Sequence, residues 1–125
     1  MKKHNLINNK YSEEELEKYI HLFESYDWRH ISIYHILSES FIEKYQDKLD
    51  WVCISYAQKL SEEFIEKYSH RLWWNYISQY QNLSEQFIMK HINNINLNRL
   101  MQNKNIPIKI RLKIAKEISL IKEII

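Results

Sequence analysis

A tandem repeat is the feature of this sequence that most restricts its fold. The segments 37–59 and 60–82 have equal length, align without a gap and are identical at more than half of their positions. A third copy, 83–105, keeps the opening Leu-Ser-Glu and the Phe-Ile pair, and two parts of an earlier copy lie within 11–36 with a few additional residues between them. Residues 106–125 begin like a further copy and then diverge. We therefore predict one domain of four units and a C-terminal cap.

Each unit is predicted to contain two short helices. Serine before an acidic residue and an apolar run is the pattern of a helix N-cap, and it recurs at Ser38, Ser61 and Ser84. A second helix is predicted to begin near a recurring polar residue, at Asp27, Asp50 and Asn96. The sequence contains no glycine, so we expect asparagine in the left-handed conformation where helices end, at Asn82, Asn94 and Asn105.

A single unit of this length cannot bury its own apolar side chains, so neighbouring units must stack to form a continuous core. The predicted fold is all-α, a short α-solenoid of about four helix-pair repeats with a C-terminal capping helix. Its handedness stays open. Tryptophan recurs at one position of the repeat, which indicates a core position, in Trp28, Trp51 and Trp74.

The predicted C-terminal helix has more apolar positions than one packing face needs. One stripe contains isoleucine at five positions, namely Ile110, Ile114, Ile118, Ile121 and Ile125. Three further residues widen it, namely Ile108, Leu112 and Ala115. The pattern favours a helix that folds back over the last groove, and a homodimer through this helix is the alternative.

The charge of the chain is unevenly distributed. The formal net charge is only +2, but residues 1–82 carry 10 basic and 13 acidic residues, whereas residues 83–125 carry 8 basic and 3 acidic ones. A solvated helix face explains this basic end most simply. A nucleic-acid surface is the alternative interpretation.

Composition excludes several classes of protein. No uncharged stretch is long enough to span a bilayer, and no apolar stretch follows the lysines of the first ten residues, so we expect neither a membrane segment nor a secretory signal. A single cysteine, Cys53, fits a reducing compartment, and we expect a cytoplasmic protein. The lack of glycine removes the loops that bind phosphate groups.

Catalytic and metal sites are not indicated. The two closest histidines, His30 and His35, point about 140° apart on one helix. Glutamates recur with the repeat, whereas a catalytic pair depends on one asymmetric pocket. Cys53 is interpreted as a small packing residue. We therefore predict no enzyme activity, no cofactor and no metal.

One break in the periodicity suggests a binding site. Trp73 occupies the position of the polar residues that begin the other second helices, and Tyr76 and Tyr80 follow it at helical spacing. With the neighbouring His70 and Arg71, these side chains have the composition of an interface hot spot. The alternative is simple interdigitation, because the preceding unit has small residues at two equivalent positions, Cys53 and Ala57.

The units opening LSESFIEKY and LSEEFIEKY, each followed by a tryptophan and Ile-Ser, resemble the short helical repeats of many uncharacterised proteins of giant viruses and phages. The resemblance covers roughly residues 11–105 and carries no catalytic or ligand residues. It implies a viral or phage protein that acts by binding, in the host cell cytoplasm. By analogy with anti-CRISPR proteins, we expect an inhibitor of a host defence factor, with a host protein or nucleoprotein complex as partner. The alternative is a nucleic-acid binder that uses the basic C-terminal third and exposed aromatic side chains.

Overall fold

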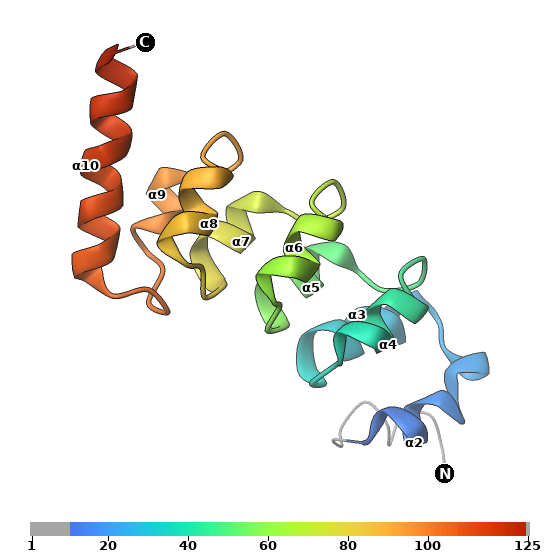
Figure 1. Ribbon diagram of the computed structural model, residues 1–125. Helices are drawn as coiled ribbons and strands as arrows, with labels where there is room; N and C mark the ends of the chain where they lie inside the picture. Colours follow the sequence, from blue (N-terminus) through green and yellow to red (C-terminus); the bar gives the residue numbers. More distant parts are fainter. Residues whose placement is uncertain (1–10, 125) are drawn as a thin grey trace. The chain divides into compact units, whose positions relative to one another are not determined.

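The computed structural model describes residues 11–124, and these residues form helices and no strand (Figure 1). Helix accounts for 62% of the described residues, which confirms the all-α class. The first ten residues, on which the prediction about a secretory signal depends, lie outside the described residues. So does Ile125 of the predicted apolar stripe.

Helices recur with the predicted period. The first helices of three units are α4 (Glu39–Lys44), α6 (Glu62–Lys67) and α8 (Glu85–Lys90), and their second helices are α5 (Trp51–Ala57), α7 (Trp74–Tyr80) and α9 (Leu97–Leu100). Equivalent helices in successive units begin exactly one repeat length apart. The two helices expected in each of these units are therefore confirmed.

The first unit contains α2 (Glu13–Glu17), the 3-10 helix η1 (Ile20–Leu22) and α3 (Ser25–Tyr34). The η1 turn lies in the part of the unit where the sequence has additional residues. The second helix begins near Asp27 as expected, but its N-cap is Glu24 and not Asp27. The Asp27 carboxylate instead accepts a hydrogen bond from the Glu24 N–H at 2.8 Å, and this capping box explains the earlier start.

The predicted serine caps are present. In Ser38, Ser61 and Ser84 the hydroxyl accepts a hydrogen bond from the backbone N–H three residues later, at 3.1 Å in each case. These bonds satisfy N–H groups that have no partner within the first turn of a helix. Asp50 and Asn96 cap α5 and α9 in the same way.

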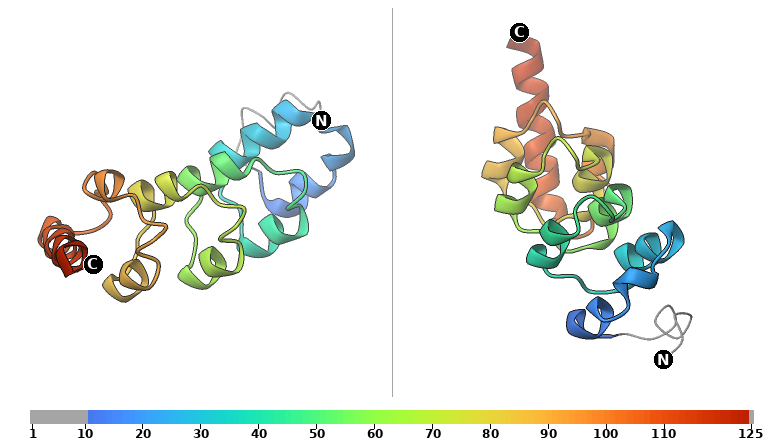
Figure 2. Two further views of the ribbon diagram at one scale, coloured as in Figure 1. Left: turned by 90° about the horizontal axis from the view of Figure 1, so that it is seen from above. Right: turned by 90° about the vertical axis from the view of Figure 1, so that its right-hand side faces the viewer.

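The described residues belong to two compact units, one ending at Gln58 and the other beginning at Lys59. In the first unit α3 packs against α5. In the second, α7 packs against α9, and α10 (Ile108–Ile124) packs against α8. Figures 1 and 2 show α10, in red, extending past the short helices of its own unit.

The second helices end without a left-handed residue. No described residue has a positive φ, so the expectation for Asn82, Asn94 and Asn105 is wrong. The C-cap residues of α3, α5 and α7 are extended instead, as at Gln58 (φ −95°, ψ 141°), whereas Met101 at the end of α9 is helical. An extended C-cap does not supply the hydrogen bonds that a left-handed turn gives to the last carbonyls of the helix. Another part of the chain must therefore provide the donors.

A buried glutamine from the following repeat provides them at the end of α3. Gln58 donates from Nε2 to the carbonyl oxygens of Ser32 at 2.8 Å and His35 at 2.6 Å. Its Oε1 accepts from the Leu37 N–H at 3.0 Å. One side chain thus satisfies three backbone groups in the interior of the first compact unit.

The second compact unit uses the same device. Asn103 donates from Nδ2 to the carbonyl oxygens of Ser78 at 2.9 Å and Gln81 at 2.8 Å, at the end of α7. The Oε1 of Gln81 accepts from the Leu60 N–H at 3.0 Å. These amide side chains explain how short helices can end in a chain without glycine.

Apolar side chains at equivalent positions of the repeat form the core of both compact units. They are Phe41, Ile42 and Leu49 in one and Phe64, Ile65 and Leu72 in the other. Among the recurring tryptophans, Trp28 and Trp51 are buried, whereas Trp74 is half-buried and stacks on His91 with ring centroids 5.4 Å apart.

Candidate functional site

The helix α7 begins without the capping hydrogen bond that its equivalents have. The side chain of Asp50 accepts a bond from the Cys53 N–H at 3.2 Å, and that of Asn96 accepts one from the Arg99 N–H. The backbone of Trp73 (φ −96°, ψ 104°) has nearly the conformation of Asp50 (φ −87°, ψ 107°), but no side-chain cap bond forms. An indole has no acceptor oxygen, so the Trp73 side chain cannot cap α7.

The Trp73 side chain is 54% exposed, and that of Tyr80 is 44% exposed. Tyr76 is half-buried, and its ring centroid lies 6.3 Å from that of Tyr80. These three residues follow one face of α7, and we call them the aromatic surface. Two large rings are therefore exposed to solvent, one at the N-cap of α7 and one in its last turn.

A residue of α9, Arg99, contacts the aromatic surface. The Arg99 guanidinium lies over the Tyr76 ring, with Cζ 5.6 Å from the ring centroid. Arg99 also donates from Nη1 to Gln79 Oε1 at 2.8 Å, and Asn105 donates from Nδ2 to the Tyr80 carbonyl at 2.5 Å. These contacts hold Tyr76 and the end of α7 in place in the free protein.

Sequence reasoning missed Arg99. The available signal was its position, because Arg99 lies one repeat length after Tyr76 and therefore occupies the equivalent position of the next unit. Arg99 and Tyr76 therefore form a cation–π contact between equivalent positions of successive helix pairs.

The other two predicted members lie in the turn before α7. His70 is exposed, and Arg71 is half-buried. The Arg71 N–H donates to the Tyr68 carbonyl at 2.9 Å, so the turn has a fixed backbone conformation. Their part in binding stays a prediction.

Cys53 lies inside the first compact unit, where only 2% of it is exposed. Burial raises the pKa of its thiol, and the Tyr56 hydroxyl lies 3.6 Å from Sγ. The hydrogen bond to Cys53 and burial raise the pKa of Tyr56 to about 12. A thiol in this state is a poor nucleophile.

The part of the chain that the structure describes contains no group of three His, Cys, Asp or Glu side chains placed to share a metal ion. It also contains no helix with the length and apolar character needed to cross a membrane.

A second exposed aromatic row was not predicted. Tyr26 and Tyr34 on α3 are 66% and 62% exposed, with His30 between them. His30 and Tyr34 lie exactly two repeat lengths before Tyr76 and Tyr80. The equivalence follows from the same register that aligns Trp28 with Trp51 and Trp74.

A comparison of the chain with protein-family models, curated proteins and solved structures found no match.

Proposed function

We propose that this chain is a non-catalytic protein-binding module whose contact surface is centred on Trp73. The observation that carries the proposal is the exposed indole at a cap position where the equivalent residues are polar and form capping bonds. Loss of a cap costs about 1 kcal/mol of stability, so a tryptophan here needs a gain elsewhere. Binding a partner supplies that gain.

The chemistry of the aromatic surface supports a protein partner. Tryptophan and tyrosine are enriched among the few interface residues that dominate binding energy. The contact between Arg99 and Tyr76 fixes one ring before binding, which lowers the entropy cost of association.

A nucleic-acid partner is less well supported. The basic C-terminal third contains one aromatic residue of the Phe, Trp and Tyr type, Phe87, and that residue is buried. Base stacking would have to use the aromatic surface on α7 instead. We therefore treat nucleic-acid binding as an outcome that the experiment below can reveal.

We also propose that successive helix pairs continue as an α-solenoid, since the same hydrogen bonds recur within both compact units. Inhibition of a host factor by a viral or phage protein is proposed from the resemblance of the repeat alone. Such a protein would act by occupying a surface of its target.

The test is affinity capture with the tagged chain after nuclease treatment, followed by measurement of the dissociation constant of the captured protein. Trp73→Ala should weaken binding by about 2 kcal/mol, or roughly thirty-fold, as truncation of a central aromatic anchor does. Its melting temperature should stay close to that of the wild type.

The matched control is Gln86→Ala, which truncates an exposed side chain on α8. It should bind like the wild type. Equal affinity of Trp73→Ala and the wild type would overturn the proposal. So would capture that disappears with nuclease and a binding constant that falls steeply with salt, because these identify a nucleic-acid partner.

A further inference from the structure

The helix α3 exposes a row of rings along one face. Tyr26, His30 and Tyr34 follow one another at four-residue intervals, with ring centroids 6.1 Å and 4.6 Å apart. Together with Arg29 and Ile33 they line a recess of about 190 Å³. We call the three ring residues the α3 surface.

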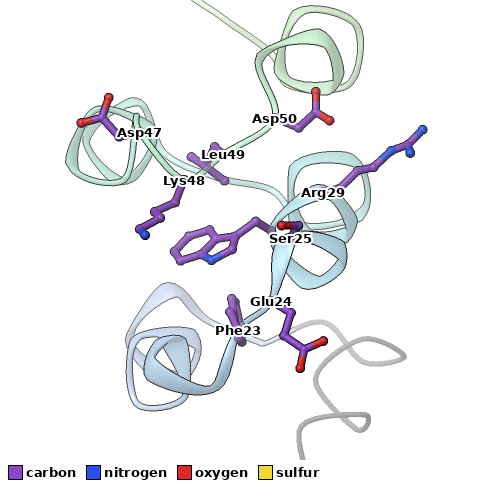
Figure 3. A pocket seen from close by; sticks show the side chains of 9 residues that line it. Phe23, Glu24, Ser25, Arg29, Asp47, Lys48, Leu49 and Asp50 are labelled. Atoms are coloured by element: carbon purple, nitrogen blue, oxygen red, sulfur yellow. The ribbon is translucent and has the colours of Figure 1, made fainter.

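The segment of the chain that contains α3 is acidic overall. A cavity of about 690 Å³ borders α3, and three carboxylates, Glu24, Asp47 and Asp50, line it together with two basic side chains. Figure 3 shows Glu24 on one side of the cavity and the two aspartates on the other. Residues 11–58 contain 10 acidic and 4 basic residues. A partner for this region should carry positive charge and apolar side chains.

The helix α10 presents such a row. Ile108, Leu112, Lys116 and Leu120 lie at four-residue intervals, and all four are exposed. The opposite face of α10 is the one that packs against α8. A helix that closes a repeat array normally has a polar outer face. We call these four residues the α10 surface.

Charge argues against pairing of α10 with α10 of a second copy. The helix Ile108–Ile124 carries five basic and two acidic residues, so a symmetric pair would oppose like charges. The segment 11–58, which contains α3 and has an excess of acidic residues, offers the complementary net charge on the same chain.

We propose that the α10 surface of one copy binds the α3 surface of a second copy, head to tail. Rows at four-residue intervals on two helices can interdigitate in the commonest mode of helix packing. Leu112 and Leu120 then contact the tyrosine rings, and the Lys116 ammonium lies over a ring face. The contact is heterologous, since it uses different surfaces of the two copies. It does not depend on the aromatic surface proposed above to bind another protein.

Sedimentation velocity on the full chain over a concentration series tests this proposal. The wild type should associate with increasing concentration, and less so at high salt. A head variant, Tyr26→Ser with Tyr34→Ser, and a tail variant, Leu112→Ser with Lys116→Glu, should each weaken self-association at least tenfold. Circular dichroism should show that both variants keep the helical fold.

Mixing the two variants gives the decisive result. The head variant retains its α10 surface and the tail variant retains its α3 surface, so the mixture should form a one-to-one heterodimer and nothing larger. A wild type that stays monomeric overturns the proposal. A head variant that still dimerises overturns it too, because it identifies a symmetric α10 contact. Binding of a monomeric wild type to anionic vesicles, lost in the tail variant, would assign the α10 surface to lipid instead.

Failure of the self-association proposal can be distinguished from failure of the proposed protein-binding function. Trp73→Ala should self-associate like the wild type, and the head variant should bind the captured partner like the wild type.

Discussion

The second helices α5 and α7 occupy equivalent positions of the repeat but differ in what they present to solvent. They share a buried scaffold, because Ile54 and Ile77 are both fully buried and Ser55 and Ser78 are as well. On the other face, small or polar residues of α5 correspond to the aromatic surface of α7. The repeated positions hold the fold, and the positions that have diverged are available for binding.

The scaffold positions also connect helix pairs by hydrogen bonds. Ser32 donates from Oγ to the Trp28 carbonyl at 2.7 Å and accepts from the Asp50 N–H at 3.3 Å. Ser78 accepts from the Asn96 N–H at 3.0 Å in the same way. A buried polar side chain with several partners tolerates little change, and this explains why these residues recur.

The largest loss of stability is expected when a buried tryptophan of the repeat is removed. Trp51 is buried, and its Nε1 donates to the Gln46 carbonyl at 2.7 Å. Trp51→Ala should therefore lower the free energy of unfolding by about 3 to 5 kcal/mol. Trp74→Ala should lower it less, because Trp74 is only half-buried. Urea unfolding of both variants checks this, and an equal or reversed order would contradict the assigned burial.

The next largest effect should follow from loss of a buried amide. Gln58→Leu leaves three backbone groups, of Ser32, His35 and Leu37, without their hydrogen bonds. Each unsatisfied buried group costs about 1 to 3 kcal/mol, so the variant should lose about 3 kcal/mol in urea unfolding. Gln86→Leu, at an exposed position, is the matched control. Similar stability of the two variants would show that the glutamine bonds are dispensable.

The glutamines also show where sequence reasoning fell short. The serine caps were predicted because the capping bond joins residues three apart, and such a pattern is visible in the sequence. The bonds of Gln58 join residues 21 to 26 apart, so nothing local indicated them. Recurrence of glutamine at one position of the repeat, in Gln58 and Gln81, was the available signal.

The candidate site was predicted in part for a similar reason. The break at Trp73 is visible because Asp27, Asp50 and Asn96 define what that position normally contains. The α3 surface was not predicted because tyrosine occupies both buried and exposed positions, as Tyr68 and Tyr26 show. Its exposure is decided by packing and has no local signature in the sequence.

A smaller change in stability is expected when acid protonates Glu66. The hydrogen bond from Lys90, followed by the one from His91, lowers the pKa of Glu66 below its usual 4.5. Since the folded state holds this carboxylate ionised, its contribution is complete above pH 4.5 and is lost as the pH falls through the lowered pKa. Lys90→Gln should therefore show a slightly weaker loss of stability in acid than the wild type, measured by thermal unfolding between pH 6 and pH 3. Identical acid profiles would indicate that the exposed ion pair contributes nothing.

The most direct test of the central claim, that Trp73 serves binding and not folding, is the free energy of unfolding of Trp73→Asp. The Tyr76 N–H donates to the Trp73 carbonyl at 3.0 Å, and aspartate can offer it the side-chain acceptor that Asp50 offers to the Cys53 N–H. We predict that Trp73→Asp is at least as stable as the wild type and about 1 kcal/mol more stable than Trp73→Ala. A loss of about 2 kcal/mol or more relative to the wild type would contradict the claim, because it would mean that the indole is a packing residue.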